Sequence, residues 1–170
     1  VYPAEGVHEG YGESSLQLQK EKKDTAKAPL NIALEAKEYT ITFAANKKTL
    51  TRKKLFDWSQ ESDEQIRYYS GTATYKTTFR WKNKPNKDQQ IYLNLGTVYN
   101  LATVRVNGVD CGTIWTAPYR ADITGALKKG INELEIEVTN TWANALTGAD
   151  EGKAPFDGIW TNAKYRRAEK

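Results

Sequence analysis

Aromatic, amide and guanidinium side chains are the residues of this sequence whose types best suit contact with a ligand. Pyranose sugars have flat C–H faces that stack on Trp and Tyr, and Arg and Asn hold hydroxyl groups through paired hydrogen bonds. The predicted carbohydrate-binding residues are Trp115, Tyr119, Arg120, Trp142 and Asn144. A competing interpretation places Trp115 and Trp142 in the core or under a loop, because large aromatic side chains are mostly buried.

The side chains needed for self-contained catalysis are scarce. His8 is the only histidine and Cys111 the only cysteine, so neither a Ser-His-Asp or Cys-His arrangement nor a zinc site is predicted. A glycosidase needs only two carboxylates, and the candidates are Asp57, Asp110, Asp122, Asp150 and Asp157. Each lies in an expected turn, cap or loop, and no spacing marks two of them as an acid/base pair. We therefore predict no catalytic and no metal-binding residues.

One stretch, residues 46–55, concentrates basic side chains without an acid. A polyanion or acidic glycan is an alternative partner for the 47–54 loop, through Lys47, Lys48, Arg52, Lys53 and Lys54. The net charge of +4 over 170 residues is small, so a solvated surface is the simpler interpretation and no nucleic-acid partner is expected. The acidic residues 60–65 would offset this loop if the two lie close. No apolar run approaches the ~20 residues of a membrane span.

The elements that position these residues are predicted to be strands. Alternating apolar and polar residues over 72–81, 91–95, 102–106 and 134–138 indicate strands with one buried face. Asn107-Gly108 favours a hairpin with a type I′ turn, and Asp122 is expected to open a short helical turn that Gly130 ends. The short connections predict an antiparallel β-sandwich of jelly-roll type, with about eight to ten strands.

The strand around Leu134 carries three like charges on its outer face. Glu133, Glu135 and Glu137 repel one another at two-residue spacing. We therefore expect cationic side chains opposite them on neighbouring strands, with Arg105 and Lys76 as candidates.

The composition divides the chain into two parts. Residues 1–29 read as an N-terminal tail and linker, with a short strand expected at 16–19, and residues 30–170 as the β-sandwich domain. The segment after Thr139 has no clear period and is expected to be irregular, with a final strand over 159–165.

Several motifs, taken in order, resemble the β-sandwich "sugar-binding" domain of glycoside hydrolase family 2. They are closer still to the C-terminal domain of family 106 α-L-rhamnosidases. The matching pieces are Tyr-Ser-Gly-Thr-Ala-Thr-Tyr at 69–75, Leu-x-Leu-Gly at 93–96, Val-x-Val-Asn-Gly at 104–108, Gly-x-x-Trp-x-x-Pro-Tyr-Arg at 112–120, Asp-Ile-Thr at 122–124, Gly-x-Asn-x-Leu-x-Ile-x-Val at 130–138 and Asn-Thr-Trp-x-Asn at 140–144.

The resemblance implies a galactose-binding-domain-like jelly roll that accompanies a separate catalytic barrel. The chain is then an accessory domain whose partners are that catalytic domain and a plant or host glycan, in an extracellular or periplasmic enzyme. Many such domains are purely structural, which is a further alternative. Some related folds hold a structural Ca²⁺, but no Asp/Asn cluster assigns one here, so no cofactor is predicted.

Overall fold

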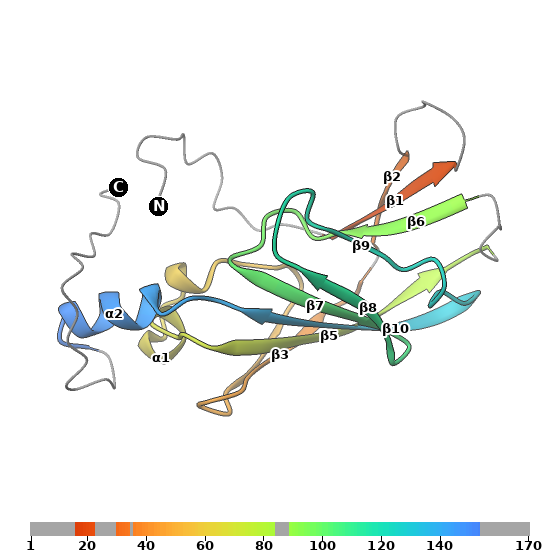
Figure 1. The fold of residues 1–170 in the computed structure, drawn as a ribbon. Coiled ribbons are helices and arrows are strands. Elements are labelled where there is room, and N and C mark those ends of the chain that lie inside the picture. The colour runs from red at the N-terminus through yellow and green to blue at the C-terminus, as the bar shows by residue number, and fades with distance from the viewer. Residues whose placement is uncertain (1–15, 23–29, 35, 84–88, 154–170) are drawn as a thin grey trace.

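In a computed structural model, which describes residues 16–22, 30–34, 36–83 and 89–153, the chain folds into two antiparallel β-sheets (Figure 1). The four-stranded sheet has the order β2-β1-β6-β9 and the six-stranded sheet the order β4-β3-β5-β10-β7-β8. The strands are β1 (Gln17–Lys22), β2 (Leu30–Ala33), β3 (Tyr39–Phe43), β4 (Thr49–Arg52), β5 (Thr72–Trp81), β6 (Gln89–Asn94), β7 (Leu101–Val106), β8 (Val109–Ile114), β9 (Arg120–Asp122) and β10 (Gly130–Thr139). The predicted all-β sandwich is confirmed.

The core lies between the two sheets. Every second residue of a strand points inward, as the sequence predicts, so that Leu93 of β6 and Val104 of β7 are completely buried. Near one end, Trp58 forms edge-to-face contacts with Phe43 and Tyr69 at centroid distances of 5.3 and 5.7 Å. The Trp58 indole N–H also donates a 2.5 Å hydrogen bond to the hydroxyl of Tyr75, whose pKa burial raises to about 12.

Strand β1 lies before residue 30, where we expected the sandwich to begin. It pairs with β6 from Gln17↔Asn94 to Lys22↔Gln89 and contributes the buried Leu18 to the core. The strand expected at 16–19 is therefore present, and it is an inner strand of the four-stranded sheet. The strand expected over 159–165 lies outside the described residues.

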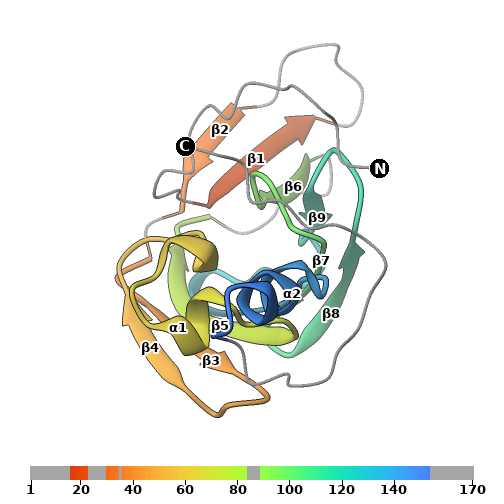
Figure 2. The same cartoon turned by 90° about the vertical axis from the view of Figure 1, so that its left-hand side faces the viewer.

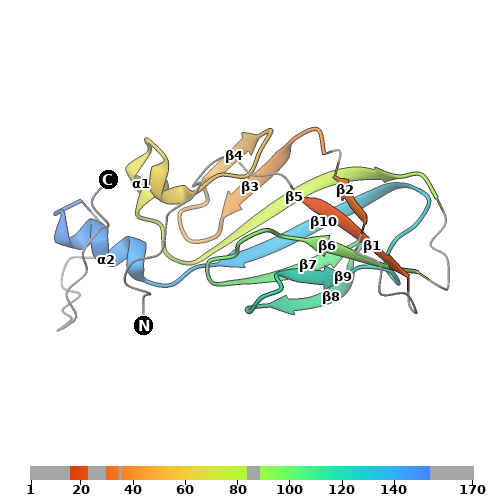
Figure 3. The same cartoon turned by 90° about the horizontal axis from the view of Figure 1, so that it is seen from above.

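The described part of the chain holds three short helical elements. The 3₁₀ helix spans Trp58–Gln60, α1 spans Glu64–Arg67 and α2 spans Ala143–Asp150. Figures 2 and 3 show α1 and α2 at the same end of the sandwich. The sequence predicted an irregular segment where α2 lies. The helix forms because its small residues Ala145 and Gly148 are buried against the fold.

The short turn predicted after Asp122 is present and is a single hydrogen-bonded turn. Asp122 accepts a 2.9 Å hydrogen bond from the backbone N–H of Thr124, and the N–H groups of Ala126 and Leu127 both donate to the carbonyl of Ile123. The segment does not continue as a helix, because the chain enters β10 at Gly130.

Strands β5 and β10 form the longest ladder in the described structure. Ten residue pairs run from Thr72↔Thr139 to Trp81↔Gly130. On the outer face Lys76 lies opposite Glu135, and their charged atoms are 3.0 Å apart. Arg105 of β7 lies 2.9 Å from Glu135 and 3.1 Å from Glu137. The expected cationic partners of the glutamates are confirmed.

A buried amide joins the β7–β8 hairpin to the loop that precedes β10. Asn107 adopts the positive φ (52°) that a type I′ turn requires, and its side-chain N–H₂ donates to the Asn132 side chain at 2.9 Å. Asn132 is fully buried, accepts a 2.9 Å bond from the N–H of Lys128, and donates to the carbonyls of Lys128 and Gly130. Both polar atoms of the Asn132 side chain therefore have their hydrogen-bond partners inside the protein.

Replacing Asn132 with Ala is expected to lower the free energy of unfolding by about 1–3 kcal/mol, because the backbone groups it serves lose their partners in a buried place. Urea unfolding of the 170-residue chain measures this. Asn83→Ala, at an exposed position, is the matched control and should change stability by less than about 0.5 kcal/mol. Equal effects would contradict the role of Asn132.

Glu135 should make stability depend on pH. Its hydrogen bond with Lys76, and then that with Arg105, lowers the pKa of its carboxyl below the ordinary 4.5. The stabilisation is therefore present at neutral pH and is lost as the pH falls below 4.5 and through the folded-state value. Glu135→Gln should reduce stability at pH 7, and the difference should shrink at pH 3, as urea unfolding at both values would measure. A deficit independent of pH would contradict this.

Candidate functional site

Three large aromatic side chains are exposed where adjacent strands of the six-stranded sheet end. Tyr99 precedes β7, Trp115 follows β8 and Trp142 follows β10, with exposed fractions of 60%, 71% and 62%. The pairs Ala102↔Ile114 and Thr139↔Leu101 place these ends side by side. We call Tyr99, Trp115 and Trp142 the aromatic end. Their exposure contradicts the interpretation that both Trp residues fill the core.

Asn140 holds the strand end that carries Trp142. Its side-chain oxygen accepts a 2.8 Å hydrogen bond from the N–H of Gly71, and its side-chain nitrogen donates to the carbonyl of Tyr69 at 2.9 Å. Gly71 has φ +144°, and a Cβ there would lie 3.0 Å from the Tyr69 hydroxyl, so glycine is required. Asn140 therefore fixes the start of β5 and the end of β10 relative to each other.

Two further hydrogen bonds complete this frame. The N–H of Thr141 donates to the side chain of Asn100 at 3.0 Å, next to Tyr99. The N–H of Ala145 donates to the Ser70 hydroxyl at 3.0 Å, which satisfies one of the free donors at the start of α2. Tyr99 and Trp142 thus project from a backbone fixed by side-chain hydrogen bonds.

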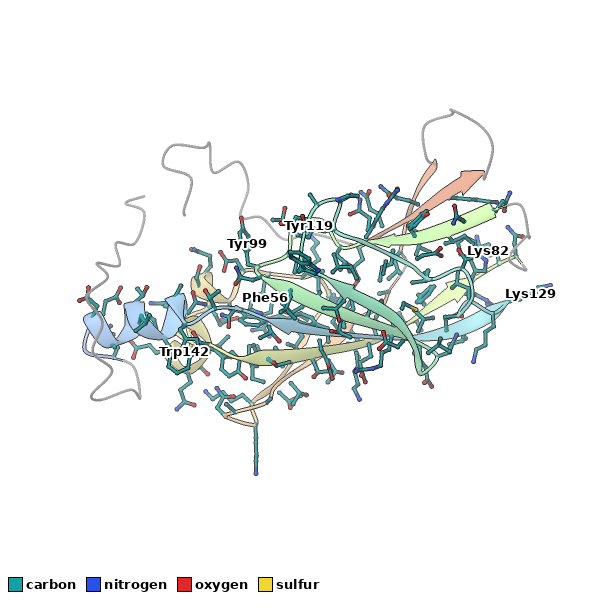
Figure 4. The ribbon with its side chains drawn as sticks, viewed as in Figure 1. Phe56, Lys82, Tyr99, Tyr119, Lys129 and Trp142 are labelled. Atoms are coloured by element: carbon teal, nitrogen blue, oxygen red, sulfur yellow. The ribbon has the colours of Figure 1, made fainter. Side chains whose placement is uncertain are left out.

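The five predicted carbohydrate-binding residues come from three places in the fold. Trp142 and Asn144 lie together at the start of α2, and Trp115 is exposed at the end of β8. Tyr119 is partly buried against the core, and Figure 4 shows it well apart from Trp142. The guanidinium of Arg120 lies 4.2 Å from the ring centre of Tyr92, on the outer face of the four-stranded sheet.

Tyr99 was missed by the sequence reasoning. It lies in the connection between β6 and β7, outside every alternating segment. The sequence could have indicated it only as an aromatic residue between two predicted strands. Its exposure next to Asn100, whose side chain binds Thr141, makes it part of the same frame as Trp142.

The basic loop is partly neutralised by the acidic residues that follow it. Lys48 forms an ion pair with Asp63, and Arg52 lies 2.9 Å from Glu61. These cations lower the pKa of both carboxyls through hydrogen bonds. The expected offset between the 47–54 loop and residues 60–65 is confirmed, which leaves the loop less positive than its sequence indicates.

Three of the candidate carboxylates accept hydrogen bonds from nearby backbone N–H groups. Asp57 accepts a hydrogen bond from the N–H of Ser59, Asp110 from that of Gly112 and Asp122 from that of Thr124. Asp157 lies outside the described residues. In residues 16–22, 30–34, 36–83 and 89–153, no three His, Cys, Asp or Glu side chains gather as metal ligands would. No helix in that same part of the chain has the length and apolarity to cross a membrane.

A family model described as the glycosyl hydrolase 2 galactose-binding domain-like family matches residues 43–169, which is well over half of the chain. The chain belongs to this family. The resemblance carried by the sequence motifs is therefore confirmed at the level of the domain.

Relatives of this galactose-binding-like domain are much longer proteins. A Formosa agariphila protein provisionally named a beta-glucuronidase is 46% identical over 104 residues, which are 61% of this chain and 9% of that protein. The rhamnosidase structure from Novosphingobium sp. PP1Y aligns with a TM-score of 0.75 and 36% identity, over 86% of this chain and 14% of that one. The chain thus spans about a tenth of the length of these relatives.

A more distant structure shares the fold. The Ruminococcus gnavus beta-glucuronidase aligns with a TM-score of 0.52 and 18% identity, over 82% of this chain and 23% of the other. At 18% identity this similarity shows that the two proteins share the sandwich fold and nothing more.

Trp115→Ala should leave the fold of the domain intact, because the side chain is exposed. Its free energy of unfolding should change by less than about 0.5 kcal/mol. Trp58→Ala is the matched control: it empties a buried site lined by Phe43 and Tyr69 and should cost about 3–5 kcal/mol. Thermal unfolding followed by circular dichroism compares the two, and a loss of cooperative melting in Trp115→Ala would contradict the assignment of Trp115 to the surface.

Proposed function

We propose that this domain is a non-catalytic accessory sandwich of a glycoside hydrolase and that its aromatic end packs against the catalytic domain of the same enzyme. The observation that supports the proposal is the gathering of Tyr99, Trp115 and Trp142, all exposed, at adjacent strand ends. The family membership and the small share of the longer relatives that the domain spans are consistent with an accessory role.

The physical chemistry of the aromatic end suits a protein partner. Trp and Tyr are enriched in the centres of interfaces, where a single side chain often contributes about 2 kcal/mol or more to binding. A rigid frame reduces the entropy lost on association, and the bonds made by Asn140 and Asn100 supply one. Scattered single aromatics need no explanation, whereas three exposed aromatic side chains at neighbouring strand ends are typical of an interaction surface.

Direct sugar binding is the second candidate, favoured by the exposure of both Trp115 and Trp142. A sugar site also needs polar groups around the stacked ring. Arg120 instead lies over Tyr92, and Tyr119 is partly buried, so fewer of the predicted polar and aromatic partners surround the two Trp residues. Packing against a protein therefore accounts for more of the arrangement. Export from the cytoplasm is part of the same proposal.

The test compares the isolated 170-residue chain with the glycoside hydrolase that carries it. The double variant Trp115→Ala/Trp142→Ala should lower the thermal unfolding midpoint of the whole enzyme by several degrees, because the domain interface loses its anchors. The isolated chain should melt as before and should cleave no chromogenic rhamnoside or glucuronoside.

Val109→Ala/Ile131→Ala is the matched control, since both side chains are exposed and apolar but lie away from the aromatic end. It should leave the whole enzyme unchanged. An unaltered midpoint in the Trp double variant would count against packing at this surface. Heat on titration of the isolated chain with rhamnose or glucuronic acid, abolished by Trp115→Ala, would favour sugar binding instead, and turnover by the isolated chain would overturn the non-catalytic assignment.

A further inference from the structure

A group of cations lies at the opposite end of the β5–β10 ladder from the aromatic end. The last pairs are Ile131↔Arg80 and Gly130↔Trp81, so Lys82 and Lys129 are the residues that adjoin this end of the ladder on the two strands. Figure 4 shows both at the same end of the sandwich, far from Trp142. We call Arg80, Lys82, Lys128 and Lys129, all exposed, the basic end.

These four cations have no carboxylate partner within the described residues. The ion pairs there engage Lys48, Arg52, Lys76, Arg105 and Lys153 instead. Across from Arg80 the strand offers the apolar side chain of Ile131, which is 55% exposed. The nearest acid along β10 is Glu133, opposite Thr78. Positive charge therefore accumulates at this end. Further along the same sheet face, Glu135 and Glu137 neutralise the cations Lys76 and Arg105.

The position of these charges is fixed by the fold. Buried Asn132 binds both the N–H and the carbonyl of Lys128 at 2.9 Å, and it also binds the carbonyl of Gly130. Hydrogen bonds from Asn132 therefore fix the turn that carries Lys128 and Lys129. Like charges held at one end of a sheet repel one another. A bound anionic ligand would reduce this repulsion.

We propose that the basic end binds the carboxylate or sulfate groups of an acidic polysaccharide. The site differs from the 47–54 loop, where Lys48 and Arg52 already pair with Asp63 and Glu61. Lysine acts as a point charge that suits separate anionic groups along a chain. No aromatic side chain is exposed among the described residues at this end, so stacking on nucleic-acid bases has no platform here. The choice of a glycan rests on the proposed function, whereas the site itself does not.

Affinity electrophoresis of the 170-residue chain through polygalacturonate, heparin, dextran or duplex DNA tests the proposal. Retardation by polygalacturonate or heparin but not by neutral dextran is expected, and it should fall steeply between 50 and 300 mM salt, since release of condensed counterions drives such binding. Lys82→Glu/Lys129→Glu should weaken the binding at least tenfold.

Lys47→Glu/Lys53→Glu is the matched control, because it changes the net charge equally at exposed positions of the other basic segment. It should weaken binding less than threefold. Equal losses in the two variants, absence of retardation at 50 mM salt, or tighter binding of DNA than of either polysaccharide would each overturn the proposal. The aromatic-end variants leave these charges untouched, so the outcome is independent of whether that end packs against a catalytic domain.

Discussion

The ten-residue pairing of β5 with β10 is the constraint on which the rest of the domain depends. These two strands are central in the six-stranded sheet, and β3 and β7 pair with their outer sides. Since the side chains of a strand alternate between faces, one register decides which residues enter the core along four strands. The same register brings Lys76 against Glu135 and places the glutamate ladder within reach of Arg105.

The ladder also gives the domain two chemically different ends. Beyond Thr72↔Thr139, Asn140 binds Gly71 and the chain turns into α2 with Trp142 exposed. Beyond Trp81↔Gly130 lie Lys82 and the turn with Lys129, which Asn132 fixes by hydrogen bonds. Side-chain amides, Asn140 at one end and the buried Asn132 at the other, therefore fix both surfaces, one apolar and one cationic. The two proposals place a neighbouring domain at the first surface and an anionic polymer at the second.

Local patterns predicted much of the fold. Alternation located the core strands, Asn107-Gly108 marked the β7–β8 hairpin, and the repulsion of Glu135 and Glu137 pointed to Arg105. The missed helix has a physical cause. Helix α2 is short and depends on burial of Ala145 and Gly148, which no local period reveals. The turn after Asp122 was predicted from its cap residues, and the structure has it as a single turn before β10.

The sequence by itself determined the sandwich, the family and the lack of any obvious catalytic constellation, because period and motif order are local properties of the chain. Only the tertiary structure decided that Trp115 and Trp142 are exposed, that Arg120 lies over Tyr92, and that Lys48 and Lys76 pair with carboxylates. Exposure and charge neutralisation depend on which segments become neighbours. That choice is made by strand pairing between residues far apart in the sequence, such as Thr72 with Thr139.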